Sequence, residues 1–170
     1  MKLFAVLLFT VTAATAVNAQ TLKFGHIDLQ ALVQLMPERT AAEEEFNKFQ
    51  AEIEDIYGDM QKQYQTKMTE FQAMGEDVSE IKRNAKVEEI QDIQQRMQNY
   101  SVTAQQQIQQ KQGELLQPVF DKAEKAIEEV AKEKGLIYVF DSGAANRTIL
   151  YKSNQSLDLL PLVKTKLGIQ

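Results

Sequence analysis

The 170-residue sequence contains no cysteine and no tryptophan, and it has a single histidine, His26. Without cysteine, the chain forms no disulfide and has no thiolate to act as a nucleophile or metal ligand. It also lacks a glycine-rich phosphate loop and any Ser-His-Asp pattern that could support nucleophilic catalysis. Asp28, Asp141 and Asp158 are expected to serve turns and helix caps, and His26 is expected to be a packed or rim residue. We therefore expect no enzyme, cofactor site or metal site.

Long apolar runs are also scarce, apart from one at the start of the chain. Residues 1–19 combine a positive charge at Lys2, a short apolar stretch and the small-x-small sequence Val17-Asn18-Ala19. This pattern is typical of a secretory signal peptide cleaved after Ala19, and the threonines that dilute it argue against a buried core helix. No later stretch reaches the roughly 20 apolar residues of a membrane span. We expect an exported mature chain that begins at Gln20.

Positive charge is scarce in the middle of the chain. Residues 38–117 carry nine Lys and Arg side chains against sixteen Asp and Glu side chains, a net charge of −7. The rest of the mature chain carries nine against eight, a net charge of +1. An acidic surface repels phosphate groups, so we expect neither nucleic acid nor an anionic lipid surface as a partner.

Apolar residues in the first half of this acidic segment recur in steps of three and four, which average the 3.5-residue period of a coiled coil. Gly75, which can adopt a positive φ, and the capping residues Asp77 and Ser79 predict a break at residues 75–79. Two long helices joined by a short turn form an antiparallel hairpin, here about 60 Å long at about 1.5 Å per residue and paired symmetrically about Glu76. The first stripe contains Phe46, Phe49, Ile53, Ile56, Met60, Tyr64, Met68, Phe71 and Met74, and the second contains Val78, Ile81, Ala85, Ile93, Met97, Tyr100, Ala104, Ile108, Leu115 and Val119.

Two prolines separate this arm from the ends of the mature chain. Pro37 fits the first turn of a helix, and Pro118 would kink one. In an antiparallel hairpin the two prolines fall at nearly the same level. We therefore expect residues 20–37 and 118–170 to form a body, and residues 38–117 to form the arm.

Three short strands are expected in the body. The segments "LKFGHIDL" (residues 22–29) and "LIYVF" (residues 136–140) predict two of them, the second buried on both faces. After the turn sequence "DSGAAN", the segment "RTILY" (residues 147–151) predicts the third. Because three strands leave exposed sheet edges, we expect several copies of the chain to complete the sheet in a closed homo-oligomer.

The chain has only seven glycines, and their positions are informative. Gly135 and Gly168 follow lysine-containing segments and are expected to end helices. Gly58 and Gly113 lie inside the predicted arm helices, where each costs up to about 1 kcal/mol relative to alanine. Together with Pro118 they are candidate hinges for the arm, although drift without function explains the two glycines equally well.

The two ends of the mature chain carry a family resemblance. The segment "FGHIDLQALVQLMPE" (residues 24–38) and the segment "GLIYVFDSGAANRTILYKSNQSLDLLPLVKTKLGI" (residues 135–169) are similar to the opening and closing elements of the Skp/OmpH family of periplasmic chaperones. The arm matches by pattern only. The resemblance implies an α+β fold in which a small β-barrel-like body is completed by a homotrimer and each chain extends one helical tentacle. It further implies that the tentacles hold unfolded outer-membrane proteins without ATP, and it carries over no catalytic residue.

Charge is where the sequence departs from this family. Its best-known members have basic arms that attract acidic clients and lipopolysaccharide, whereas residues 38–117 here are net −7. Binding of lipopolysaccharide or anionic lipid is therefore doubtful. Electrostatic capture of clients is expected to be weaker or directed at different clients.

Flexible and amphipathic side chains gather in the distal part of the arm. Methionine adapts to many unlike partners, and tyrosine presents an apolar ring with a polar tip. These residues either contact client chains or fill the seam between the two helices. They can do both if the seam leaves apolar edges exposed. The candidate client-binding residues are Met60, Tyr64, Met68, Phe71, Met74, Met97 and Tyr100.

Two functions fit this organisation. One is a holdase for unfolded envelope proteins, and the other is a structural coiled-coil spacer or adaptor of the cell envelope. The internal glycines and the glutamine-rich segment at residues 103–114, which contains Ile108 as its one large apolar residue, interrupt the seam. Interrupted packing favours the holdase, because a spacer would favour a continuous seam.

Overall fold

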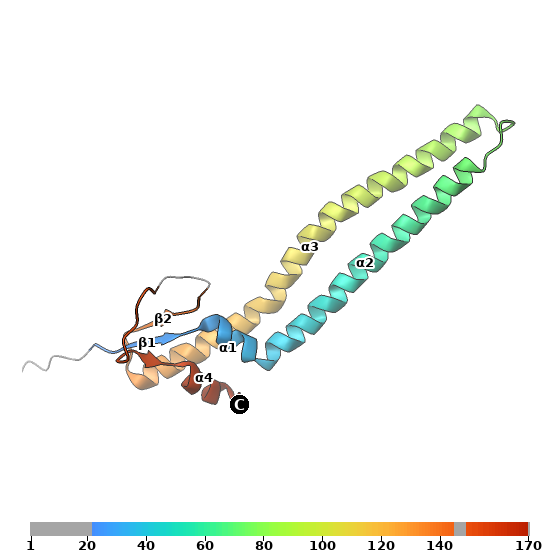
Figure 1. The fold of residues 1–170 in the computed structure, drawn as a ribbon. Coiled ribbons are helices and arrows are strands. Elements are labelled where there is room, and N and C mark those ends of the chain that lie inside the picture. The colour runs from blue at the N-terminus through green and yellow to red at the C-terminus, as the bar shows by residue number, and fades with distance from the viewer. Residues whose placement is uncertain (1–21, 145–148, 170) are drawn as a thin grey trace, which may run out of the picture.

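The computed structural model describes residues 22–144 and 149–169, which form a small body and one long helical arm (Figure 1). The expected signal peptide and its cleavage site after Ala19 lie outside the described residues. The elements in chain order are β1 (Phe24–Ile27), α1 (Leu29–Leu35), α2 (Pro37–Gln72), α3 (Glu80–Lys134), β2 (Tyr138–Asp141), β3 (Leu157–Asp158) and α4 (Leu160–Leu167).

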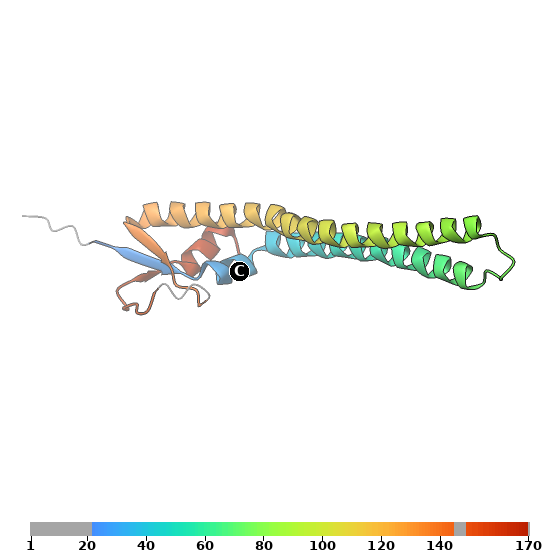
Figure 2. The same ribbon diagram turned by 90° about the horizontal axis from the view of Figure 1, so that it is seen from above.

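The arm is the predicted antiparallel hairpin of α2 and α3, which lie side by side along their length (Figures 1 and 2). Pro37 occupies the first turn of α2, as expected, because its missing N–H needs no partner there. Pro118 does not divide α3, which runs as one 55-residue helix from the arm into the body. The expected pairing about Glu76 is slightly wrong. The Lys86–Glu70 and Lys111–Glu45 pairs are both symmetric about residue 78.

The seam between the arm helices has the predicted period, but it does not contain every residue that was predicted to lie in it. Ala104 and Ile93 are buried as expected, and so is Ile90, which the predicted stripe omits. Ile56 and Ile81 were expected in the seam, but their side chains are 46% and 82% exposed. A two-helix seam covers only a narrow stripe of each helix, so residues one position from its centre face solvent.

The turn at the arm tip differs from the expected glycine turn. Among the described glycines, only Gly135 and Gly168 have a positive φ, and both end a helix as predicted. Gly75 therefore does not use the left-handed region that only glycine visits easily. Ser79 is the N-cap residue of α3, but its side chain makes no capping hydrogen bond.

The sheet has the order β2-β1-β3 with all strands parallel, and the expected third strand at residues 147–151 is not one of them. Residues 149–151 form no strand, and residues 147–148 lie outside the described chain. Leu157–Asp158 provides the third strand instead, and the Leu159 N–H donates to the His26 carbonyl over 2.9 Å. The physical reason is burial: Leu159 is fully buried, whereas Leu150 is 95% exposed, so burying Leu159 fixes which segment pairs with β1.

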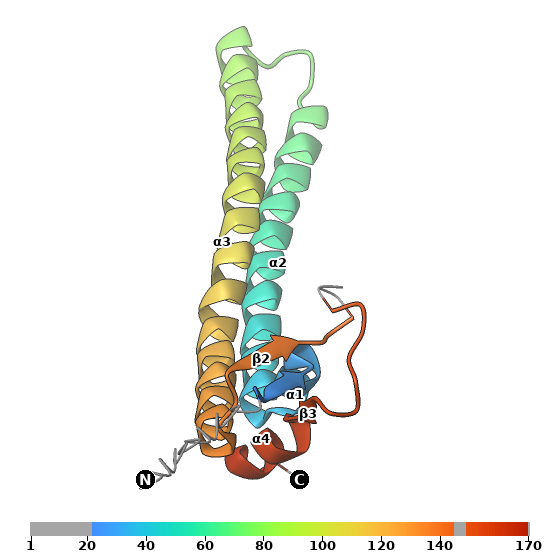
Figure 3. The same cartoon turned by 90° about the vertical axis from the view of Figure 1, so that its left-hand side faces the viewer.

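The body core lies between the inner face of this sheet and helices α1, α3 and α4 (Figure 3). Gly25 permits close packing, because a Cβ atom there would overlap the Leu159 side chain and lie 2.7 Å from Leu136 Cδ1. Asp158 accepts a hydrogen bond from the Leu160 N–H at the start of α4, close to its predicted capping role, although Leu159 is the N-cap residue. The largest fully buried side chains are Leu32, Met36, Leu159 and Val163.

Candidate functional site

The candidate client-binding residues lie along the arm seam, and all seven are half-buried. The Tyr64 hydroxyl accepts a hydrogen bond from Gln94 over 3.0 Å, and the Tyr100 hydroxyl donates to the Ile53 carbonyl over 3.5 Å. These contacts cross between α2 and α3, so the two tyrosines help to join the helices. Because each side chain is also partly exposed, client contact remains a prediction for them.

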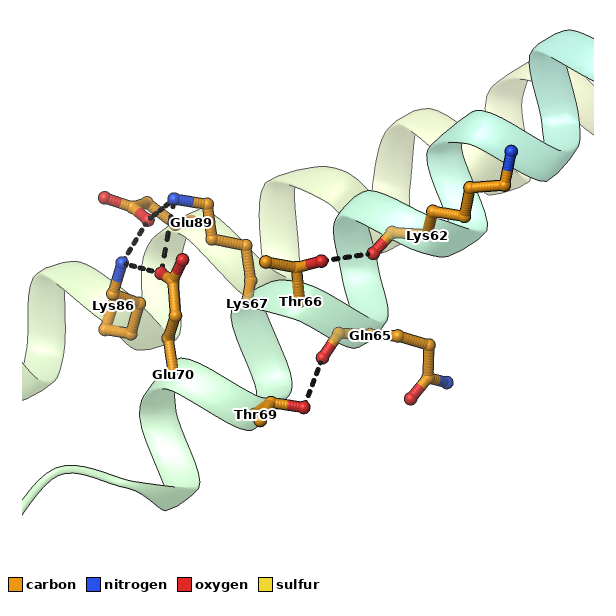
Figure 4. Close-up of polar contacts among 8 residues, drawn as sticks. All are labelled: Lys62, Gln65, Thr66, Lys67, Thr69, Glu70, Lys86 and Glu89. Atoms are coloured by element: carbon orange, nitrogen blue, oxygen red, sulfur yellow. Dashed lines mark hydrogen bonds and ion pairs between the residues drawn. The ribbon is translucent and has the colours of Figure 1, made fainter.

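An ion-pair cluster joins the two helices near the arm tip (Figure 4). Lys86 Nζ lies 2.9 Å from both Glu70 Oε2 and Glu89 Oε2, and Lys67 Nζ lies 3.2 Å from Glu89 Oε2 and 3.5 Å from Glu70 Oε2. We refer to these four residues as the distal ion cluster. Hydrogen bonds from Lys86 hold the pKa of the Glu70 and Glu89 carboxyls below their ordinary value, and the two carboxylates raise the pKa of Lys86. The cluster connects α2 to α3 beside the buried seam residues Ile90 and Ile93.

Arg83 adds a second connection at the tip. Its guanidinium carbon lies 5.8 Å from the centre of the Phe71 ring, within the range of a cation–π interaction. Its Nη2 also donates to the Gly75 carbonyl over 3.2 Å. Phe71, a candidate client-binding residue, is therefore partly covered by a cation from its own arm.

At the base of the arm, ion pairs join α3 to α2 at two levels. Lys111 Nζ lies 2.6 Å from Glu45 Oε1, and Lys122 pairs with Glu38. Between them, a hollow of about 200 Å³ lies where the glutamine-rich segment meets the start of α2. Its lining includes Ala42, Phe46, Gln112, Leu115 and Leu116.

Three exposed apolar side chains on the arm were not among the candidate binding residues. Ile56 and Ile81 were assigned to the seam, and Val102, which is 59% exposed, was in neither stripe. Their exposure depends on the orientation of each helix about its own axis, which the spacing of apolar residues alone does not fix. Val102 could have been found as an isolated branched residue on the polar side of its helix.

The candidate hinges lie where packing does not require their residue types. A Cβ atom at Gly58 or Gly113 would meet nothing within 4 Å, and neither glycine has a positive φ. Pro118 lies inside α3, which bends at the level where α2 begins (Figure 1). Bending of the arm at these positions remains a prediction.

The outer face of the sheet is a second candidate surface. The ring centres of Phe24, Tyr138 and Phe140 lie 5.9–6.5 Å apart in a stacked group on this face. The expectation that β2 is buried on both faces is therefore wrong for the single chain, since Tyr138 is 63% exposed. Beside the stack is a hollow of about 1280 Å³, lined in part by Leu150 and Tyr151.

His26 lies between this outer face and the segment that leads into β3. Its side chain is buried, and Nδ1 is 2.9 Å from the Ser156 hydroxyl. The residue is therefore packed, as expected from the sequence. Among residues 22–144 and 149–169, no three His, Cys, Asp or Glu side chains are grouped as metal ligands. Within the same ranges, no helix has both the length and the apolar character needed to cross a bilayer.

Comparison with known protein families assigns this body and arm to a family. A family model described as outer membrane protein (OmpH-like) matches residues 23–167, which include the body and the entire arm. The chain belongs to the OmpH-like family. The match confirms the resemblance seen in the sequence. Members of this family are periplasmic chaperones. Among curated proteins, none matches this OmpH-like chain.

Proposed function

We propose that this OmpH-like protein is an ATP-independent holdase that binds unfolded outer-membrane proteins in the periplasm and prevents their aggregation. The observation that carries the proposal is the arm itself, a long two-helix ribbon with half-buried Met and Tyr residues and exposed Ile56, Ile81 and Val102. Flexible methionines that are half-buried along the arm suit weak contacts with many segments of an unfolded chain. They also favour the holdase over a structural spacer, for which a tightly packed, continuous seam is expected.

The proposed active form is a homotrimer. A three-stranded sheet with two open edges and an exposed aromatic face is unfavourable in water, so the natural occupants are the same sheets of two further copies. Residues 20–37 and 118–170 would then form a shared β-barrel-like body, and residues 38–117 of each chain would form one of three arms around a client. Residues 1–19 would direct export and would be removed as the chain is translocated.

The test is an aggregation assay without nucleotide. An outer-membrane barrel protein unfolded in urea is diluted into buffer, and light scattering is followed with and without the OmpH-like protein. The proposal predicts slower scattering at a ratio of about three chains per client. The matched variants are I56S/I81S, which removes exposed apolar contacts, and T40S, which alters an exposed side chain at the arm base. Suppression by the first variant equal to that of T40S would count against the arm as the client surface.

A further inference from the structure

The arm carries more carboxylates than its own cations neutralise. Residues 38–117, all of which the structure describes, contain sixteen carboxylates and nine cations. Six of the cations are held in ion pairs with arm carboxylates, so few positive groups remain available to a partner. Within this range nine carboxylates form no ion pair, and all nine are exposed: Glu44, Glu52, Glu54, Asp55, Glu76, Asp77, Glu80, Glu88 and Glu114.

The unpaired carboxylates are distributed along the arm from its base to its tip. Glu114 and Glu52 both lie near enough to Lys111 to raise its pKa, although Glu45 already pairs with that lysine and has the largest effect. One lysine at the base is thus surrounded by three carboxylates. The surplus negative charge is therefore a property of the surface of the folded arm as well as of its composition.

Two of these carboxylates share a helix face with an exposed isoleucine. Glu52 precedes Ile56 by four residues on α2, and Glu88 follows Ile81 by seven residues on α3. These spacings place the paired side chains on the same side of their helix. The Ile56 and Ile81 side chains are 46% and 82% exposed. Each helix thus presents an apolar side chain and an anionic group on one face, one turn apart for Ile56 and Glu52 and two turns, about 10 Å, apart for Ile81 and Glu88.

We propose that this surface selects unfolded client segments in which lysine or arginine adjoins apolar residues. The inference rests on the proposed holdase function and names the class of segment that the arm holds. An apolar client side chain contacts the isoleucine, and the neighbouring basic side chain meets an unpaired carboxylate. Segments rich in Asp and Glu are repelled by the same surface. Because these charges are exposed, added salt weakens the selection, since the Debye length is about 10 Å at 0.1 M and about 3 Å at 1 M.

The experiment uses two unfolded clients with the same apolar sequence and opposite net charge. They are an outer-membrane barrel protein with Lys and Arg at its polar variable positions and the same protein with Glu at those positions. Each is diluted from urea in the presence of the full-length protein, and light scattering gives the chaperone concentration that halves aggregation. At low salt we expect this concentration to be about tenfold lower for the cationic client, because several exposed ion pairs contribute together. At about 1 M salt the difference should disappear.

A matched pair of variants assigns the effect to the arm. E52K/E88K reverses two unpaired arm carboxylates, and D121K/E124K makes the same change in net charge at exposed positions of α3 on the body side of Pro118. The arm variant should lose most of the preference for the cationic client, and the body variant should retain it. Circular dichroism checks that both variants keep their helical content.

The outcomes separate this inference from the function on which it rests. Suppression of neither client would refute the holdase function. Equal suppression of both clients by the unmodified protein, or better suppression of the anionic one, would overturn the charge selection and leave the holdase function standing. A preference that is lost in D121K/E124K but retained in E52K/E88K would also overturn it, because the selecting surface would then lie in the body.

Discussion

The contact between Gly25 and Leu159 gives a prediction whose size follows from the structure. Leu159 is fully buried in the body core, so L159A should destabilise the protein by about 2–5 kcal/mol through lost burial and a residual cavity. G25A adds a methyl group that overlaps the Leu159 side chain and lies 2.7 Å from Leu136 Cδ1, and overpacking of this kind costs about 1–3 kcal/mol. The strain should be large for one methyl group because Gly25 lies on β1, the central strand of the sheet.

The two changes compensate each other in this structure. In G25A/L159A the added methyl group enters space that the truncated leucine has left, so the double variant should be less destabilised than the sum of the single variants. The expected coupling is about 0.5–3 kcal/mol, the range for residues in contact. Urea unfolding followed by circular dichroism measures it, with all four proteins at one concentration because oligomerisation contributes to stability. Additivity within about 0.5 kcal/mol would refute the packing of Leu159 against Gly25.

Three further predictions concern the sheet face, the arm tip and the arm surface. Y138D/F140D places two charges on the exposed aromatic face, so sedimentation velocity should show monomers with unchanged helical content, and an unchanged oligomer would exclude this face from the interface. The distal ion cluster contains two carboxyls whose pKa lies below the ordinary 4.5, so its contribution to stability is fully present above pH 4.5 and is lost as the pH falls through the lowered values. Amide hydrogen exchange at the arm tip should therefore be constant from pH 5 to 7, after correction for the intrinsic rate, and should accelerate only below about pH 4; earlier acceleration would contradict the pairing. Replacement of the buried seam residue Ile90 by alanine should lower the free energy of unfolding by about 2–4 kcal/mol, whereas I81A should change it by less than about 0.5 kcal/mol, and equal effects would place Ile81 in the seam.

Local sequence signals predicted the arm well. Proline at the start of α2, glycine at the end of α3 and an apolar period of 3.5 residues each have a local physical cause, so the hairpin follows from the chain itself. The rotation of each helix about its axis was less predictable. Ile56 and Ile81 were assigned to the seam but face solvent, and Ile90, which the predicted stripe omits, is buried, since the period fixes the spacing of a stripe but not its width.

The sheet was less predictable, because strand pairing depends on distant contacts. The segment at residues 147–151 has a stronger strand pattern than Leu157–Asp158, but only the latter leads directly into the buried Leu159 and α4. Burial of Leu159 therefore decides the pairing, and no local propensity encodes it. The candidate site was predictable in part. The Met and Tyr residues could be identified from the sequence, whereas the ion pairs that join the helices could be identified only once the register of the hairpin was known.

The proposed function requires three chains to hold one unfolded client together without nucleotide. Native mass spectrometry of the mature protein, mixed with a urea-unfolded outer-membrane barrel protein and diluted, measures this directly. We expect a dominant species whose mass equals three chains plus one client, and we expect this species to be absent for Y138D/F140D. A species with one chain per client, or a trimer that leaves the client free to aggregate, would contradict it.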